Sequence, residues 1–127
     1  MMSVLHADDE ETIRRVYFAV LTSFGYETTS VSSGEEAYAL LEHKKYDLLL
    51  SDFHMTGITG LELVKKIRQN ETGLKENYNI QIILMSGCLN ESLENELYSA
   101  GANKILSKPV EFGTLSSTIE DLIRNSA

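Results

Sequence analysis

Five residues with side chains suited to phosphoryl and metal chemistry stand at the ends of apolar runs. Asp8 and Asp9 close the first run, and Asp52, Ser86 and Lys108 close three later ones. Carboxylate oxygens are hard ligands that suit Mg²⁺, which retains waters and leaves positions for phosphate oxygens. A lysine ammonium and a serine hydroxyl can bind a phosphoryl group, and an aspartate beside them can be the nucleophile that forms an aspartyl phosphate. The residue types therefore predict phosphoryl transfer to a carboxylate beside a divalent cation.

Each of these signals also has a purely structural explanation. Asp8-Asp9-Glu10 is a typical helix N-terminus, where acidic side chains cap the backbone and oppose the helix dipole. Ser86-Gly87 fits a turn, and Lys108-Pro109 fits the end of a strand. Asp52 is harder to explain in this way, because an acidic residue rarely closes a run of leucines. The joint occurrence of all these residues favours the functional interpretation.

Short apolar segments, which alternate with longer stretches of helical periodicity, must position these residues. Leu48–Leu50 and Ile80–Met85 are nearly all apolar, which is typical of strands covered on both faces of a parallel sheet. The five predicted strands are Ser3–Ala7, Glu27–Val31, Asp47–Ser51, Ile80–Met85 and Lys104–Leu106. Because the carboxyl ends of parallel strands meet at one edge of a sheet, we expect the chemically active residues to gather there.

Amphipathic helices are predicted between and after the strands. The first carries six apolar residues that fall on one helical face: Ile13, Val16, Tyr17, Val20, Leu21 and Phe24. Five strand–helix repeats with short connections predict an α/β fold, a doubly wound five-stranded parallel sheet with helices on both faces. The irregular stretch Gln69–Asn79 is interpreted as an exposed loop.

The length of 127 residues predicts one domain, over residues 1–127, with no output domain, and the composition is typical of a globular protein. The 19 acidic and 11 basic residues give a formal net charge of −8, which argues against binding to nucleic acid or to an anionic membrane. No apolar run approaches the roughly 18 residues that cross a bilayer, and the first residues lack the features of a secretory signal. Cys88 is the single cysteine, so no internal disulfide can form and the cytoplasm is the expected location.

In the order and spacing of its motifs, the sequence resembles the receiver domains of two-component response regulators, with the single-domain chemotaxis regulators as the nearest shape. The resemblance covers essentially the whole chain. It is carried by Asp8-Asp9, by Asp52 after Leu48–Ser51, by Met55 and Gly60, by Ser86-Gly87, and by Gly101-Ala102 ahead of Lys108-Pro109.

This resemblance implies a flavodoxin-like sheet with strand order 2-1-3-4-5 and a role for each site residue. Asp52 would be the phosphoacceptor that attacks the phosphohistidine of a partner. Mg²⁺ would be held by the carboxylates of Asp8, Asp9 and Asp52 and by the backbone carbonyl of His54. Ser86 would donate a hydrogen bond to one phosphoryl oxygen and Lys108 would pair with another. The Lys108–Pro109 peptide bond would be cis, against a base rate of about 5–6% for bonds before proline.

Four positions depart from the family pattern. Thr56 replaces the usual proline, and Ser86 replaces a threonine. Ile105 stands where the family usually has a Tyr or Phe that reports phosphorylation, so the chain lacks the aromatic residue of that switch. His6 stands in the first strand where an apolar residue is usual, and we interpret it as a buried histidine whose hydrogen bonds are satisfied.

Two classes of function are compatible with these residues. The first is a signalling receiver that catalyses only its own phosphorylation and slow dephosphorylation. Its partners would be a sensor histidine kinase or a histidine phosphotransfer protein, and a downstream protein target. The alternative is a Mg²⁺-dependent phosphohydrolase that forms an aspartyl phosphate. Such enzymes commonly place a second carboxylate two residues after the nucleophile, where this chain has His54, so the receiver is favoured.

Overall fold

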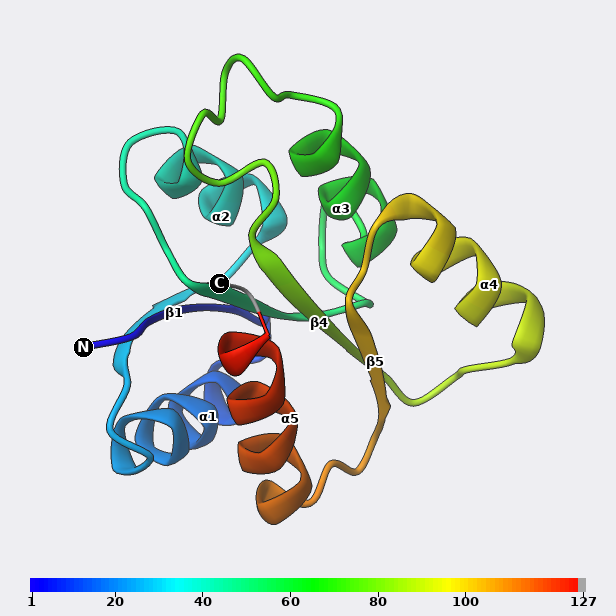
Figure 1. The fold of residues 1–127 in the computed structure, drawn as a ribbon. Coiled ribbons are helices and arrows are strands. Elements are labelled where there is room, and N and C mark those ends of the chain that lie inside the picture. Colours follow the sequence, from blue (N-terminus) through cyan, green and yellow to red (C-terminus); the bar gives the residue numbers. More distant parts are fainter. Residues whose placement is uncertain (126–127) are drawn as a thin grey trace.

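The computed structural model describes residues 1–125, within which five strands alternate with five helices (Figure 1). The strands are β1 (Ser3–Ala7), β2 (Glu27–Val31), β3 (Leu48–Asp52), β4 (Gln81–Ser86) and β5 (Lys104–Ser107). The helices are α1 (Glu11–Ser23), α2 (Gly34–Leu41), α3 (Gly60–Arg68), α4 (Glu91–Ala100) and α5 (Phe112–Arg124). None of the helices in this range is long and apolar enough to cross a membrane.

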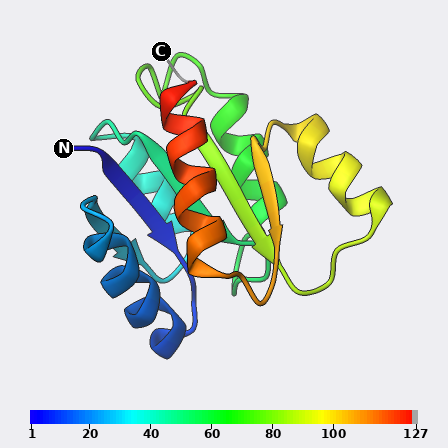
Figure 2. The same ribbon diagram turned by 60° about the horizontal axis from the view of Figure 1, so that its bottom comes forward.

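All strands pair in parallel, in the order β2-β1-β3-β4-β5. This confirms the predicted doubly wound fold and the strand order that the resemblance implied. Helices α1 and α5 cover one face of the sheet, and α2, α3 and α4 cover the other (Figures 1 and 2). The central strand β3 is buried on both sides, with Leu48, Leu49 and Leu50 all 0% exposed. Its near-continuous apolar run reflects this double coverage.

Two of the predicted site residues, Asp52 and Ser86, are fixed in position because they pair with neighbouring strands of the sheet. β3 ends at Asp52 and not at Ser51, because Asp52 still pairs with Met85 of β4. β4 in turn ends at Ser86, which pairs with Ser107 of β5. Both side chains are therefore fixed by strands at the carboxyl edge of the sheet and not by mobile loops.

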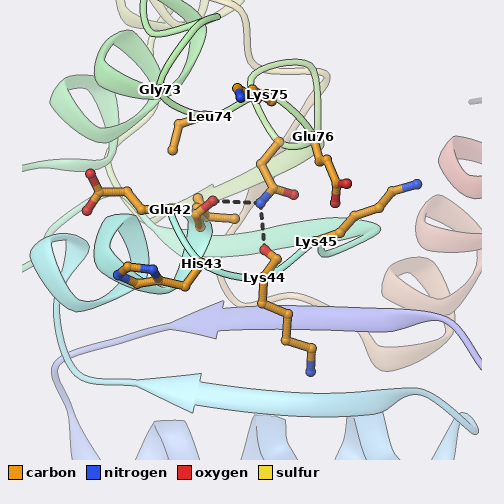
Figure 3. A pocket seen from close by; sticks show the side chains of 10 residues that line it. Glu42, His43, Lys44, Lys45, Gly73, Leu74, Lys75 and Glu76 are labelled. Atoms are coloured by element: carbon orange, nitrogen blue, oxygen red, sulfur yellow. Dashed lines mark hydrogen bonds between the residues drawn. The ribbon is translucent and has the colours of Figure 1, made fainter.

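The segment between α3 and β4 is partly buried, although the sequence predicted an exposed loop over Gln69–Asn79. Asn77 is 2% exposed. Its amide nitrogen donates to the carbonyl oxygens of Leu41 and Lys44 at 2.8 and 2.6 Å, drawn as dashed lines in Figure 3. Its amide oxygen accepts from the Tyr46 N–H at 3.0 Å. The prediction therefore holds for most of the segment and fails at Leu74 and Asn77, which are buried. Asn77 anchors this segment to the loop between α2 and β3.

A pocket of about 390 Å³ lies between these loops, bordered by three lysines: Lys44, Lys45 and Lys75 (Figure 3). It adjoins the segments that lead into β3 and β4, so it lies at the amino edge of the sheet. Asp52 and Ser86 lie at the opposite, carboxyl edge. The pocket is therefore separate from the predicted site.

His6 is buried in β1, as the sequence predicted, but one of its ring nitrogens lacks a hydrogen-bond partner within the described range. Its ring stacks on Tyr17 with 5.2 Å between centroids, and Nδ1 lies 3.5 Å from the Ser30 hydroxyl. Nε2 is buried without a hydrogen-bond partner among residues 1–125. Burial, aided by the positive charges of Arg14 and Lys108, lowers the pKa of His6 to about 4. The expectation of a satisfied histidine was right about burial and wrong about hydrogen bonding.

Acidification is expected to destabilise the fold through His6. The pKa is about 4 in the folded chain and 6.5 ordinarily, so between these values the unfolded chain binds a proton that the folded chain does not. The free energy of unfolding should therefore fall as the pH drops through this range, by roughly 3 kcal/mol for this group. Chemical denaturation in EDTA should show a flatter pH dependence in His6→Leu and the wild-type dependence in the control His43→Gln. An unchanged slope in His6→Leu would rule His6 out as the cause.

Candidate functional site

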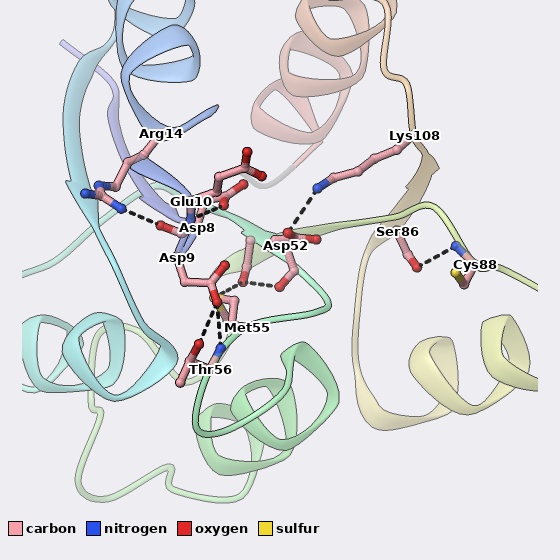
Figure 4. Close-up of polar contacts among 11 residues, drawn as sticks. Asp8, Asp9, Glu10, Arg14, Asp52, Met55, Thr56, Ser86, Cys88 and Lys108 are labelled. Carbon is pink, nitrogen blue, oxygen red and sulfur yellow. Dashed lines mark hydrogen bonds and ion pairs between the residues drawn. The ribbon is translucent and has the colours of Figure 1, made fainter. Parts of the chain in front are cut away.

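The carboxyl edge of the sheet brings three carboxylates together (Figure 4). Asp8 and Asp9 follow β1, and Asp52 ends the neighbouring strand β3. One oxygen from each carboxylate lies within 4.8 Å of the other two. Asp8 is 1% exposed and Asp52 is 7% exposed, whereas Asp9 is open to solvent. Two of the three groups are thus largely removed from water, where repulsion between like charges is strong.

Lys108 is the counter-ion of Asp52. Its Nζ lies 3.0 Å from Oδ2 of Asp52, and its backbone N–H donates to the carbonyl oxygen of Ser86 at 2.9 Å. The Lys108–Pro109 peptide bond is cis, as the resemblance implied. Partial burial alone would lower the pKa of Lys108, but the hydrogen bond and charge of Asp52, joined by the charge of Asp8, outweigh burial and raise it. Lys108 is therefore charged at neutral pH beside the Asp52 carboxylate.

Asp8 has a buried oxygen that no group within residues 1–125 satisfies. Its Oδ1 accepts from the Glu10 N–H at 2.9 Å, while Oδ2 has no hydrogen-bond partner within the described residues. Burial raises the pKa of the Asp8 carboxyl; the Glu10 N–H opposes this shift, and the Asp52 charge adds to it. A divalent cation would satisfy Oδ2 and offset the repulsion among the three carboxylates. The oxygen-only donor set therefore fits Mg²⁺.

Thr56 holds the third carboxylate, and sequence reasoning missed this role. The backbone N–H and the hydroxyl of Thr56 both donate to Oδ2 of Asp9, each at 2.8 Å (Figure 4). These hydrogen bonds lower the pKa of Asp9, the one from the hydroxyl most strongly. In the sequence Thr56 stood out only as a missing proline. The overlooked signal is that threonine supplies two hydrogen-bond donors where proline supplies none.

Ser86 and His54 border the cluster. Ser86 is fully buried at the end of β4, and its hydroxyl accepts from the Cys88 N–H at 3.1 Å (Figure 4). His54 is exposed, two residues after Asp52, and its ring meets the ring of Phe53 edge-on with 4.8 Å between centroids. The structure thus places both residues at the predicted edge of the sheet. The roles assigned to the Ser86 hydroxyl and the His54 carbonyl stay predictions.

An aromatic residue of α4 contacts the backbone of Ile105, at the position where the resemblance implies a Tyr or Phe. Ile105 is 7% exposed, and its N–H donates to the Tyr98 hydroxyl at 3.3 Å. Tyr98 is 43% exposed, so its ring links α4 to β5 at the surface. The helical pattern of the sequence could not reveal this contact, because it does not specify which strand a half-exposed tyrosine meets.

A known protein family shares this arrangement of motifs. The sequence profile of the response regulator receiver domain matches residues 4–120. The chain belongs to this family. The receiver domain is 28% identical to the response regulator receiver protein CpdR of Brucella abortus, over 97% of this chain and 98% of CpdR. Other curated relatives are far longer, and the chain spans only 15–16% of the length of three of them.

Solved structures of other receiver domains have the same fold. The chemotaxis protein CheY4 of Vibrio cholerae is 30% identical, with a TM-score of 0.85 over 96% of this chain and 98% of CheY4. The receiver domain of the sensor histidine kinase PA1611 from Pseudomonas aeruginosa is 26% identical, with a TM-score of 0.86 over 98% of both chains. That structure is described with a magnesium ion coordinated in its active-site cleft. Receiver domains are signalling modules of two-component systems, so the phosphohydrolase alternative is not favoured.

Proposed function

We propose that this receiver domain accepts a phosphoryl group on Asp52 from the phosphohistidine of a sensor histidine kinase or a histidine phosphotransfer protein. The phosphorylated form then binds a downstream protein target differently. The observation that carries the proposal is the 3.0 Å ion pair between Asp52 and Lys108, at the edge of the sheet where three carboxylates meet. This pair puts a positive charge beside the oxygen that would receive the phosphoryl group.

The proposed transfer exchanges one bond to phosphorus for another. A carboxylate oxygen of Asp52 attacks phosphorus and forms the P–O bond of an acyl phosphate. The P–N bond to the donor histidine breaks, and its electron pair stays on the imidazole nitrogen, which takes up a proton. Lys108 then pairs with a phosphoryl oxygen instead of the free carboxylate. The Ser86 hydroxyl, one strand away, donates to another phosphoryl oxygen.

Asp8, Asp9 and Asp52 would hold Mg²⁺, with the backbone carbonyl of His54 as a further ligand. Oδ2 of Asp8, which has no hydrogen-bond partner in the described part of the chain, supports this assignment, because a buried carboxylate oxygen without a partner is costly. The magnesium described in the receiver domain of PA1611 also supports it. A bound cation would neutralise negative charge on the oxygens of the phosphoryl group during transfer.

An apolar surface beside Lys108 supports protein partners for this edge of the sheet. Val16 of α1 and Phe112 of α5 are 43% and 42% exposed, and both line a groove that also includes Lys108 and Pro109. A donor protein must bring its histidine to Asp52 and would cover this groove. The net charge of −8 makes nucleic acid and anionic membranes poor partners, so we propose that the partners are proteins. We also propose a cytoplasmic location, which the single cysteine in the sequence favours.

Turnover of a small phosphodonor separates the receiver from the phosphohydrolase. With excess acetyl phosphate and Mg²⁺, the phosphorylated protein should accumulate toward one phosphoryl group per chain. Inorganic phosphate should then appear no faster than this acyl phosphate decays. Many rapid turnovers without an accumulating phosphoprotein would contradict the proposal and favour the hydrolase.

A further inference from the structure

We propose that Thr56 is a positioning residue that presents Asp9 to a divalent cation through a single carboxylate oxygen, and that it thereby favours Mg²⁺ over Ca²⁺. The inference deepens the proposed function, since it rests on the magnesium site assigned there. It concerns a residue at a position that is usually occupied by proline in the family.

The two loops that follow β1 and β3 are joined at this point. Asp9 lies on the first loop and Thr56 on the second, 47 residues apart in sequence. Both donors of Thr56, the backbone N–H and the hydroxyl, reach the same oxygen of Asp9 at 2.8 Å. Two bonds from one residue fix the carboxylate more firmly than one bond would. The backbone donor exists only because residue 56 is not proline.

The second oxygen of Asp9 is the one left for a cation. Figure 4 shows it turned away from Thr56, on the side of the site where Asp52 lies. Hydrogen bonds to an ionised carboxylate are strong, so Oδ2 is held by Thr56 and the group can ligate through one oxygen only. When a residue that orients a metal ligand in this way is mutated, the affinity for the metal typically falls by about 10- to 100-fold.

Ligation through one oxygen discriminates between the two common divalent cations. Mg²⁺ requires compact octahedral coordination and keeps several waters, so single carboxylate oxygens suit it. Ca²⁺ takes six to eight oxygens and often uses both oxygens of a carboxylate. A carboxylate that is held by two hydrogen-bond donors cannot easily rotate to ligate a cation with both of its oxygens. Release of Asp9 from Thr56 should therefore lower Mg²⁺ affinity more than Ca²⁺ affinity.

Thr56 could instead compete with the cation for Asp9, and this would change the Mg²⁺ affinity in the opposite direction. If Thr56 competed with the cation for Asp9, its two hydrogen bonds would have to break on binding. Removing the donors would then tighten Mg²⁺ binding. The sign of the change in affinity thus separates positioning from competition.

Calorimetric titration of the full chain with MgCl₂ and with CaCl₂ tests the inference. Thr56→Ser keeps both donors and should stay within about twofold of wild type. Thr56→Val keeps the shape and the N–H but loses the hydroxyl, so Mg²⁺ affinity should fall several-fold. Thr56→Pro loses both donors and should bind Mg²⁺ about 10- to 100-fold more weakly, with a clear loss of preference over Ca²⁺. Thr22→Val, an exposed threonine on α1, is the matched control and should match wild type.

The outcomes distinguish failure of the magnesium site from failure of the role of Thr56. Thermal melts in EDTA first establish that every variant is folded. If the wild-type chain binds neither cation, both the magnesium site and the role of Thr56 are overturned. If the wild type binds Mg²⁺ but Thr56→Val and Thr56→Pro keep its affinity and its preference over Ca²⁺, only the role of Thr56 fails. Tighter Mg²⁺ binding in these variants would likewise overturn positioning, in favour of competition.

Discussion

A Lys108→Met variant is expected to incorporate phosphate from acetyl phosphate about 100-fold more slowly than the wild type at saturating Mg²⁺. Nζ of Lys108 lies 3.0 Å from the Asp52 oxygen, so the lysine is already in place to stabilise negative charge on the incoming phosphoryl group. Methionine keeps the length of the side chain and removes the charge. Loss of one preorganised hydrogen-bond donor to a developing charge typically costs about two to three orders of magnitude in rate.

Lys104→Met is the matched control for this experiment. Lys104 is an exposed lysine at the start of β5. The Lys104→Met variant should therefore be phosphorylated at the wild-type rate. The rate is measured from intact mass as phosphorylated protein accumulates. Equal rates in Lys108→Met and Lys104→Met would show that Lys108 takes no part in the transfer.

Much of the fold could be predicted because its central strands, β3 and β4, are strongly apolar. Leu48–Leu50 is a run typical of a doubly covered strand, and Asp52, two residues after it, is conspicuous for the same reason. Parallel strands then bring Asp8, Asp52 and Lys108 to one edge, whatever their separation in sequence. The strand order itself came from the resemblance, since periodicity does not fix the order of strands in a sheet.

The missed features all depend on where two loops or elements meet in space. Thr56 and Asp9 come together only once β1 and β3 are neighbours, and the residue types alone do not reveal their hydrogen bonds. Asn77 looks like an ordinary loop residue until its amide is found between Leu41 and Lys44. Polar side chains that anchor loops carry no apolar signal, so pattern analysis assigns them to the surface.

His6 and Tyr98 illustrate a second limit. Burial of His6 follows from its place in an apolar strand. That Nε2 has no partner among the residues the structure describes depends on the distances to neighbouring side chains. The contact of Tyr98 with the Ile105 N–H depends on how α4 packs against β5. Both features depend on side-chain positions to within about an ångström, and the periodicity of a sequence does not specify positions that finely.

The central claim is that Asp52 is the phosphoacceptor, and Asp52→Asn tests it most directly. Asparagine has nearly the same shape but is a poor nucleophile, so the variant should fold and yet accept no phosphoryl group. Asp121→Asn, on the exposed surface of α5, is the matched control.

The measurement is the intact mass of wild type and both variants after incubation with acetyl phosphate and Mg²⁺. We predict that the wild type and Asp121→Asn gain the mass of one phosphoryl group, which alkali and hydroxylamine remove as expected for an acyl phosphate. Asp52→Asn should gain none. Undiminished incorporation in Asp52→Asn would place the phosphoryl group on another residue and contradict the assignment.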